Sequence, residues 1–270
     1  MKNLRFALLC AICLLALLIS ERAFAQRYVM MDYMYVPEEQ QANYLEVEQE
    51  LWKPIHKEFL KDGNLQGWYL LEIPYPGGTN AEYHYITVRV YKEPVANPMD
   101  GLMDKARKVH PDADLEAFAD KTMQSRDLVK THGFYAWEAF GWEDRKMSTV
   151  GQQVYFRVPM DKWEAYRKME VEDYHPMHKA EIAAGYRHGW MGLQLMRPMG
   201  MAEPYQFVAV DFYKDYDQYI RRMPADERAA AFKKALPNRT EESISQNFYD
   251  TVELVHLEEW RLVDYVRAEN

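Results

Sequence analysis

The sequence repeats one segment of itself without a gap. Residues 36–92 align with residues 158–214 at a constant offset of 122, and 18 of the 57 aligned positions are identical. Agreement of this density without a gap is not expected by chance, so we predict two copies of one structural unit, residues 26–147 and residues 148–270. The identical pairs include Tyr44 and Tyr166, Glu48 and Glu170, Pro54 and Pro176, His56 and His178, and Trp68 and Trp190.

The first 25 residues have the pattern of a signal peptide. Lys2 and Arg5 form a charged start, residues 6–19 are an apolar run, and residues 23–25 are a cleavage site of the Ala-x-Ala type. The run is shorter than the roughly 20 residues that a bilayer span needs. We therefore expect an exported protein, periplasmic or extracellular, with no membrane contact after cleavage. Both cysteines lie in this segment, so we expect neither a disulfide nor thiol chemistry in the mature chain.

The charge of the chain excludes one class of partner. The formal net charge is −9, and a surface of this sign repels the phosphates of nucleic acids. The chain is also rich in aromatic residues, with 20 Tyr and 7 Trp. We therefore expect a small-molecule ligand and no binding of nucleic acid. Assembly into a homo-oligomer is compatible with the sequence.

Each copy has the same predicted order of elements. A strand with alternating polarity is followed by a polar helical segment, two strands joined by a Pro-Gly turn, a second helical region and a last strand. This order, βαββαβ, is that of the ferredoxin-like unit, an antiparallel sheet with both helices on one face. The predicted ranges are 28–36, 38–62, 67–75, 83–91, 98–130 and 134–142 in the first copy, and 152–158, 161–184, 189–197, 205–213, 216–250 and 252–263 in the second.

A short motif extends this prediction to a known superfamily. Residues 52–57 read Trp-Lys-Pro-Ile-His-Lys, and Gly63 and Gly67-Trp68 follow them. The second copy repeats the pattern at residues 174–190. The motif resembles the dimeric α+β barrel superfamily, in particular its EthD-like and NIPSNAP-like branches. The resemblance implies an α+β fold in which two tandem ferredoxin-like repeats pack their antiparallel sheets face to face as a fused barrel. It fixes no chemistry, because monooxygenases, cyclases, isomerases and haem proteins share the fold.

Strand alternation predicts which side chains face the barrel interior. Ile86, Val88, Val208 and Val210 form an apolar set that we expect beneath the helices. The opposite, polar and aromatic set would then line an interior cavity for an aromatic or polyhydroxylated ligand. The alternative is that these groups only pair with one another across the sheets. The predicted ligand-binding residues are Tyr33, Trp68, Tyr85, Arg89, Glu138, Arg157, Trp190, Asp211, His256 and Glu258.

The first helix of each copy carries the candidate catalytic residues, Glu48 with His56 and Glu170 with His178. At about 100° per residue, each glutamate falls in the middle of an apolar stripe. A desolvated carboxylate there would have a raised pKa, as a general acid or base requires. The alternative is a structural hydrogen bond from each glutamate. Pro54 and Pro176 interrupt these helices, so we expect a kink before each histidine.

Three functional hypotheses follow. The first is a small-molecule barrel performing cofactor-free proton transfer, as in an isomerase, cyclase, lyase or monooxygenase. The second is a binding or stress-response module without turnover. The third is a haem protein with His56, His178, His188 or His256 as the axial ligand. We expect no metal site, because the paired histidines of the second copy, His175 and His178, have no counterpart at matching spacing in the first.

Overall fold

The computed structural model describes residues 27–268, and the predicted signal peptide lies outside them. Eight antiparallel strands close into one barrel, in the order β1-β3-β2-β8-β5-β7-β6-β4. This is the predicted α+β architecture. The strands are β1 (Arg27–Tyr35), β2 (Leu65–Glu72), β3 (Tyr85–Tyr91), β4 (Asp127–Gly141), β5 (Val150–Arg157), β6 (Gly189–Arg197), β7 (Phe207–Tyr213) and β8 (Glu253–Arg267).

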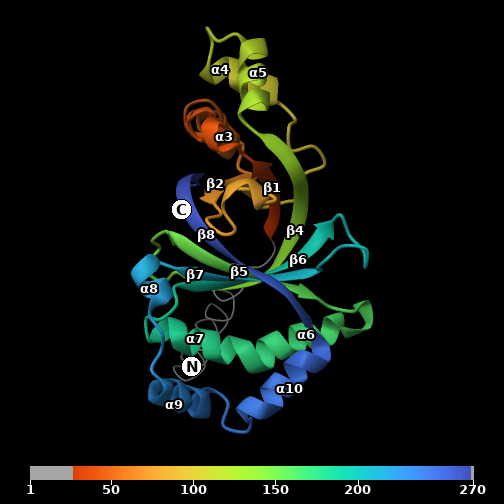
Figure 1. Cartoon of the computed structure of the whole chain (residues 1–270), viewed down its shortest axis with the longest axis vertical. Helices are drawn as coiled ribbons and strands as arrows, with labels where there is room; N and C mark the ends of the chain where they lie inside the picture. The colour runs from red at the N-terminus through yellow and green to blue at the C-terminus, as the bar shows by residue number, and fades with distance from the viewer. Residues whose placement is uncertain (1–26, 269–270) are drawn as a thin grey trace, which may run out of the picture.

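The helices form two groups on opposite sides of the barrel (Figure 1). Those of the first half are η1 (Glu38–Gln40), α2 (Gln41–Glu46), η2 (Val47–Trp52), α3 (Lys53–Lys61), η3 (Gly78–Asn80), α4 (Leu102–Val109) and α5 (Leu115–Ser125). Those of the second half are η4 (Met160–Lys162), α6 (Trp163–Met169), η5 (Glu170–Tyr174), α7 (His175–Ala183), α8 (Tyr216–Ile220), α9 (Ala225–Ala235) and α10 (Glu241–Thr251).

The kink expected at each helix proline takes the form of a π-helical segment. Pro54 has no N–H to donate to the carbonyl of Glu50, so the backbone widens before it. Segment η2 is a π-helix that ends at Trp52, and η5 is a π-helix that ends two residues before Pro176. Such segments are frequent at functional sites. Here the widened turn lies between the glutamate and the histidine of each candidate pair.

Two long strands join the halves. β4 pairs with β1 of its own half and with β6 of the other half. β8 pairs in the same way with β5 and with β2. Every strand therefore has two neighbours, and the closed barrel has no open edge.

The prediction of which face points inward is wrong for the middle strands. Ile86, Val88, Val208 and Val210 belong to one interior core that draws on both halves. Trp68 and Tyr85 pack beneath the first-half helices, and Trp190 packs beneath those of the second half. The barrel interior is mainly aliphatic, and much of the polar set lies between sheet and helices.

The error lies in the assumption that the uniformly apolar face of each middle strand packs beneath the helices, because in this barrel that face fills the interior. Tyr83 lies in the interior core, whereas Tyr85, two residues later, packs beneath the helices. The ladder of β3 begins only at Tyr85, so the alternation of this strand does not extend to Tyr83. Tyr205 and Phe207 repeat the arrangement in the second half.

Between residues 27 and 268, none of the helices combines the length and the apolar composition that a membrane span requires.

We predict that residues 26–147 alone do not form a stable monomer. In that fragment β2 and β4 lose β8 and β6, and the interior core loses its second half. Exposed strand edges and an apolar sheet face favour association. Size-exclusion chromatography and thermal melting of the fragment test this. A monomeric fragment that melts cooperatively would contradict the prediction.

Candidate functional site

A cavity of about 300 Å³ lies between the first-half sheet and the helical segment η2–α3. Its floor comes from β1 and β3, and its rim comes from the segment before α4 and from the start of β4. The polar lining residues are Asp32, Glu48, His56, Thr87, Arg89, Arg126 and Thr131. The apolar lining residues are Met30, Met34, Trp52, Trp68, Pro98, Met99 and Leu128. Glu48 and His56 are thus brought to one site, as predicted.

Two ion pairs hold opposite charges at the cavity. Arg126 Nη1 donates to Glu48 Oε1, and Arg89 Nη2 donates to Asp32 Oδ2 at 2.5 Å. The Glu48 and Arg126 side chains are only 2% and 13% exposed. Burial raises the pKa of Glu48 above its ordinary value even though Arg126 acts in the opposite direction. Glu48 is therefore a stronger base than an exposed carboxylate.

His56 is a neutral ring held between two indoles. Its ring centroid lies 5.3 Å from that of Trp68 and 6.1 Å from that of Trp52, in stacked orientations. Nδ1 is buried and has no hydrogen-bond partner. Burial, and then Arg89 and Arg126, lower the pKa of His56 to about 3. The carboxylate of Glu48 is therefore more basic than the imidazole of His56, the reverse of their ordinary order. The neutral imidazole offers a ligand a hydrogen bond rather than a charge.

The strand registers identify the second-half counterparts of these residues. Tyr33 pairs with Lys130 and Met34 with Leu128, on either side of a register shift. In the second half, Tyr155 pairs with His256 and Phe156 with Leu254, with the same shift. The offset is thus 122 for β1 and β5 but 126 for β4 and β8. Arg126 therefore corresponds to Val252, and both are the C-cap residues of the preceding helices, α5 and α10.

The second half has Val252 where the first half has the arginine that pairs with the glutamate. Val252 is buried in an apolar core with Tyr166 and Trp190. Without a hydrogen-bonded cation, burial raises the pKa of Glu170 to about 8. Arg187 instead pairs with Asp211 and contacts His178 Nδ1 at 2.7 Å. This half therefore has an internal network where the first half has an ion pair on a cavity.

The predicted ligand-binding residues fall into three groups. Trp68 and Arg89 line the cavity, although from the helix side of the sheet rather than from inside the barrel. Tyr85, Trp190 and Asp211 are also buried on the helix side or within its network, which corrects their predicted interior position. Both tryptophans are 0% exposed, so the expectation that they are buried is confirmed.

Three predicted ligand residues, Glu138, Arg157 and His256, lie at the surface rather than in the interior. Arg157 ends β5 and pairs with Glu253 at 3.1 Å, with its side chain 42% exposed. Glu138 is exposed next to a register shift between β4 and β6. The extra residue at such a shift turns the following side chains to the other face, and the regular alternation that we assumed does not include it.

Tyr33 and Glu258 lie inside the barrel, as predicted. Glu258 accepts hydrogen bonds from Tyr83, Tyr155 and Trp260 at 2.5, 3.1 and 2.9 Å. This arrangement favours the alternative interpretation, in which the interior polar groups pair with one another. His256 is exposed and stacks on Tyr155, with 4.0 Å between ring centroids.

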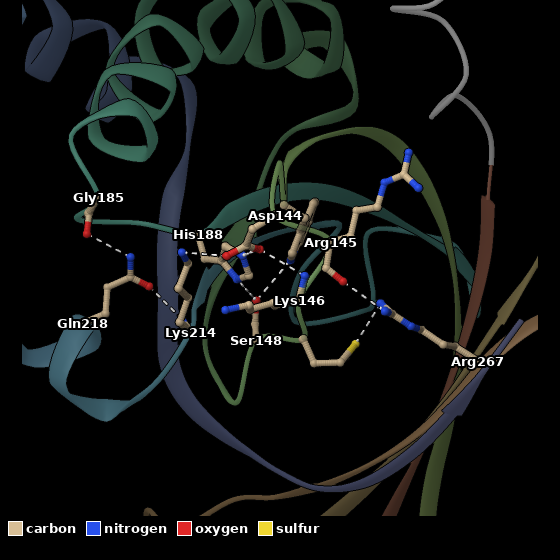
Figure 2. Close-up of polar contacts among 11 residues, drawn as sticks. Asp144, Arg145, Lys146, Ser148, Gly185, His188, Lys214, Gln218 and Arg267 are labelled. Atoms are coloured by element: carbon tan, nitrogen blue, oxygen red, sulfur yellow. Dashed lines mark hydrogen bonds and ion pairs between the residues drawn. The ribbon is translucent and has the colours of Figure 1, made fainter. Parts of the chain in front are cut away.

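The histidines considered as haem ligands are engaged or confined. Figure 2 shows His188, which directly precedes β6, beside Asp144 and Ser148 of the connection between β4 and β5. Its Nδ1 lies 2.9 Å from Ser148 Oγ, and its Nε2 lies 2.8 Å from Asp144 Oδ1. His178 contacts Arg187. The cavity beside His56 is about twice the roughly 150 Å³ that holds one benzene ring. That volume suits one or two rings. Within residues 27–268, no group of three or more His, Cys, Asp or Glu side chains is placed to hold a metal.

The sequence analysis missed Arg126, Asp32 and Trp52 as site residues. Arg126 lies outside the ungapped repeat, so the comparison of the two copies did not reach it. An alignment that allowed the four-residue change in offset would have placed Arg126 opposite Val252. A charge that occurs in one copy of a repeated unit and not in the other is a signal for a site.

The sequence matches no protein-family model and no curated protein. The fold does match solved structures. The alignment with a protein from Lactobacillus acidophilus covers 90% of this chain and 96% of that protein, at 9% identity and a TM-score of 0.52. One from Fusobacterium nucleatum covers 90% and 95%, at 10% identity and a TM-score of 0.54. The chain is a fused α+β barrel.

The two solved proteins are named as monooxygenases, an assignment that is itself provisional. At these identities the likeness extends to the fold alone. A haem-binding protein from Thermus thermophilus matches at a TM-score of 0.44, which is too distant to inform the chemistry of this chain.

We predict that the wild-type protein loses stability as the pH rises toward 8 and that the variant Glu170→Gln does not show this loss. The raised pKa of Glu170, about 8 against an ordinary 4.5, means that the folded protein keeps a proton which the unfolded chain releases. This contribution to stability is complete below pH 4.5 and is lost as the pH rises through 8. The stability of the variant relative to the wild type should rise by about 3 kcal/mol between pH 5 and pH 8. Urea unfolding measures it.

Glu48→Gln is the matched comparison at the equivalent position. It leaves the guanidinium of Arg126 without its carboxylate, so we expect a loss of about 3 kcal/mol. An equal pH dependence of the two variants relative to the wild type between pH 5 and pH 8 would show that the two halves do not differ as described.

Proposed function

We propose that the first-half cavity binds a compact organic molecule with one or two rings and that Glu48 exchanges a proton with it. The observation that carries the proposal is the Glu48–Arg126 ion pair at the cavity. The second half has no such pair, because Val252 stands at the position of Arg126. The volume of about 300 Å³ and the indole walls suit a planar ligand. Since the fold is shared by many activities, the site alone supports this function.

The chemistry is cofactor-free proton transfer. Glu48 has the raised pKa of a tuned general base, and neutral His56 presents an unpaired ring nitrogen for orientation. Arg126 and Arg89 supply positive charge where a proton leaves the ligand and an oxyanion develops. An isomerase, cyclase, lyase or monooxygenase begins with such a step.

We propose further that the chain is exported after cleavage near residue 25 and that its halves arose by tandem duplication. The charged start and apolar run of residues 1–25 support export. The matching registers of β1–β4 and β5–β8 support duplication. In this view the first half kept the polar site, and the second half became its structural partner.

Arg126→Val tests the site by giving the first half the residue of the second. The probes are one- and two-ring phenols, enolisable ketones and aromatic carboxylates. Binding should quench the fluorescence of Trp52 and Trp68, which line the cavity. We expect at least one of these classes to bind the wild type, with a Kd raised tenfold or more in the variant, because a buried charge-assisted contact is lost.

Proton transfer is tested by solvent deuterium exchange into an enolisable ketone, followed by NMR. Glu48→Gln should slow the exchange by about 100-fold or more, the usual contribution of a general base. Glu170→Gln is the control and should exchange at the wild-type rate. Equal exchange by wild type and Glu48→Gln would refute the role of Glu48 and leave the binding proposal standing on the fluorescence result.

A further inference from the structure

A second polar cluster lies inside the barrel, on the other face of the sheet from the cavity. Four tyrosines meet there in two edge-to-face pairs, Tyr33 with Tyr83 and Tyr155 with Tyr205, with ring centroids 4.8 and 4.7 Å apart. None of these four tyrosines lines the cavity. The proposed proton transfer does not use this cluster.

The cluster contains two tyrosine pairs in corresponding positions with different proton acceptors. Tyr83 donates to Glu258 Oε2 at 2.5 Å. Tyr205, its counterpart at offset 122, lies 2.7 Å from His132 Nδ1. Glu258 and His132 are themselves counterparts at the offset of 126 that relates β8 to β4. One half thus offers its tyrosine an imidazole, and the other offers a carboxylate.

Glu258 is placed to act as an ionised acceptor. Three donors, from Tyr83, Tyr155 and Trp260, point at its two oxygens, which is the pattern of a carboxylate because it has no proton to donate. The residue is only 6% exposed. Burial raises the pKa of Glu258, and the hydrogen bonds oppose this rise. The carboxylate therefore carries a desolvated negative charge that a proton would remove.

We propose that Tyr83 and Glu258 form a redox site in which Tyr83 loses an electron and its hydroxyl proton passes to Glu258. The O–H bond of Tyr83 breaks, an O–H bond forms on Glu258, and the electron reduces a one-electron oxidant of the azide-radical or peroxyl-radical class to its anion. The products in the protein are a neutral tyrosyl radical and a neutral carboxylic acid.

Charge burial separates this pair from its counterpart. Oxidation of Tyr83 discharges a buried carboxylate, so the desolvation that penalises charge favours the oxidised state. Oxidation of Tyr205 would place a new imidazolium on His132, which is 6% exposed and whose pKa burial already lowers to about 4. Lys130 Nζ lies 4.8 Å above the Tyr83 ring. Its charge opposes a tyrosyl cation but not the neutral radical.

The radical site is linked through Glu258 to Tyr155 and is shielded from collision. The Tyr83 ring adjoins Tyr33, and the Tyr155 ring adjoins exposed His256. Tyr83 itself is 8% exposed. Exposed tyrosyl radicals disappear when two molecules meet, whereas a buried one persists.

Pulse radiolysis with azide radical as the oxidant tests the proposal. We expect a long-lived tyrosyl absorption in the wild type, lost in Tyr83→Phe and kept in the matched control Tyr205→Phe. Glu258→Gln keeps an acceptor oxygen but cannot take a proton, so the yield should fall several-fold. A long-lived radical that survives Tyr83→Phe, or that is lost equally in Tyr205→Phe, would overturn the proposal.

A measurement on the unaltered protein covers the case in which Glu258→Gln does not fold. Because the proton moves with the electron, formation of the long-lived radical should be slower in D2O than in H2O. Equal rates in the two solvents would refute the coupled transfer.

Discussion

The middle strands of the two halves, β3 and β7, are buried on both faces, and the rest of the structure depends on that constraint. One face meets the interior core shared by both halves, and the other meets helices. A polar side chain on either face must therefore have a partner, because an unpaired buried charge costs several kcal/mol. The ion pairs beneath the helices and the bonds to Glu258 inside the barrel are two answers to the same requirement.

The two halves share one scaffold, but the first half contains the cavity and the second half has an apolar core at the equivalent place. Both keep the glutamate, the π-helical segment, the helix proline and the buried tryptophan. They differ at the C-cap of the last helix, where Arg126 faces a cavity and Val252 fills an apolar core. The first-half carboxylate therefore has a counter-ion, whereas burial keeps the second-half carboxylate protonated near neutral pH.

The sequence predicted the element order, the barrel and the helix-borne pair Glu48 and His56. Strand and helix periodicity set the elements, and the internal repeat shows that both halves share one order of elements. The sequence placed the polar face of the middle strands inside the barrel, whereas that face packs beneath the helices. Both faces of these strands are buried, so alternation alone does not say which of them meets the helices. It also missed Arg126, because partners distant in sequence meet only through the register of β1 with β4. The identity of a ligand depends on shape, which a linear pattern does not contain.

The position of β8 has a consequence for biosynthesis. The last strand lies between β2 and β5, so it is the only neighbour of β2 other than β3 and the only neighbour of β5 other than β7. Until residues 253–267 leave the ribosome, both strands have open edges and the interior core has a gap where Trp260 belongs. The barrel therefore cannot close before β8 is made, and the nascent protein depends on whatever shields those edges until residues 253–267 emerge.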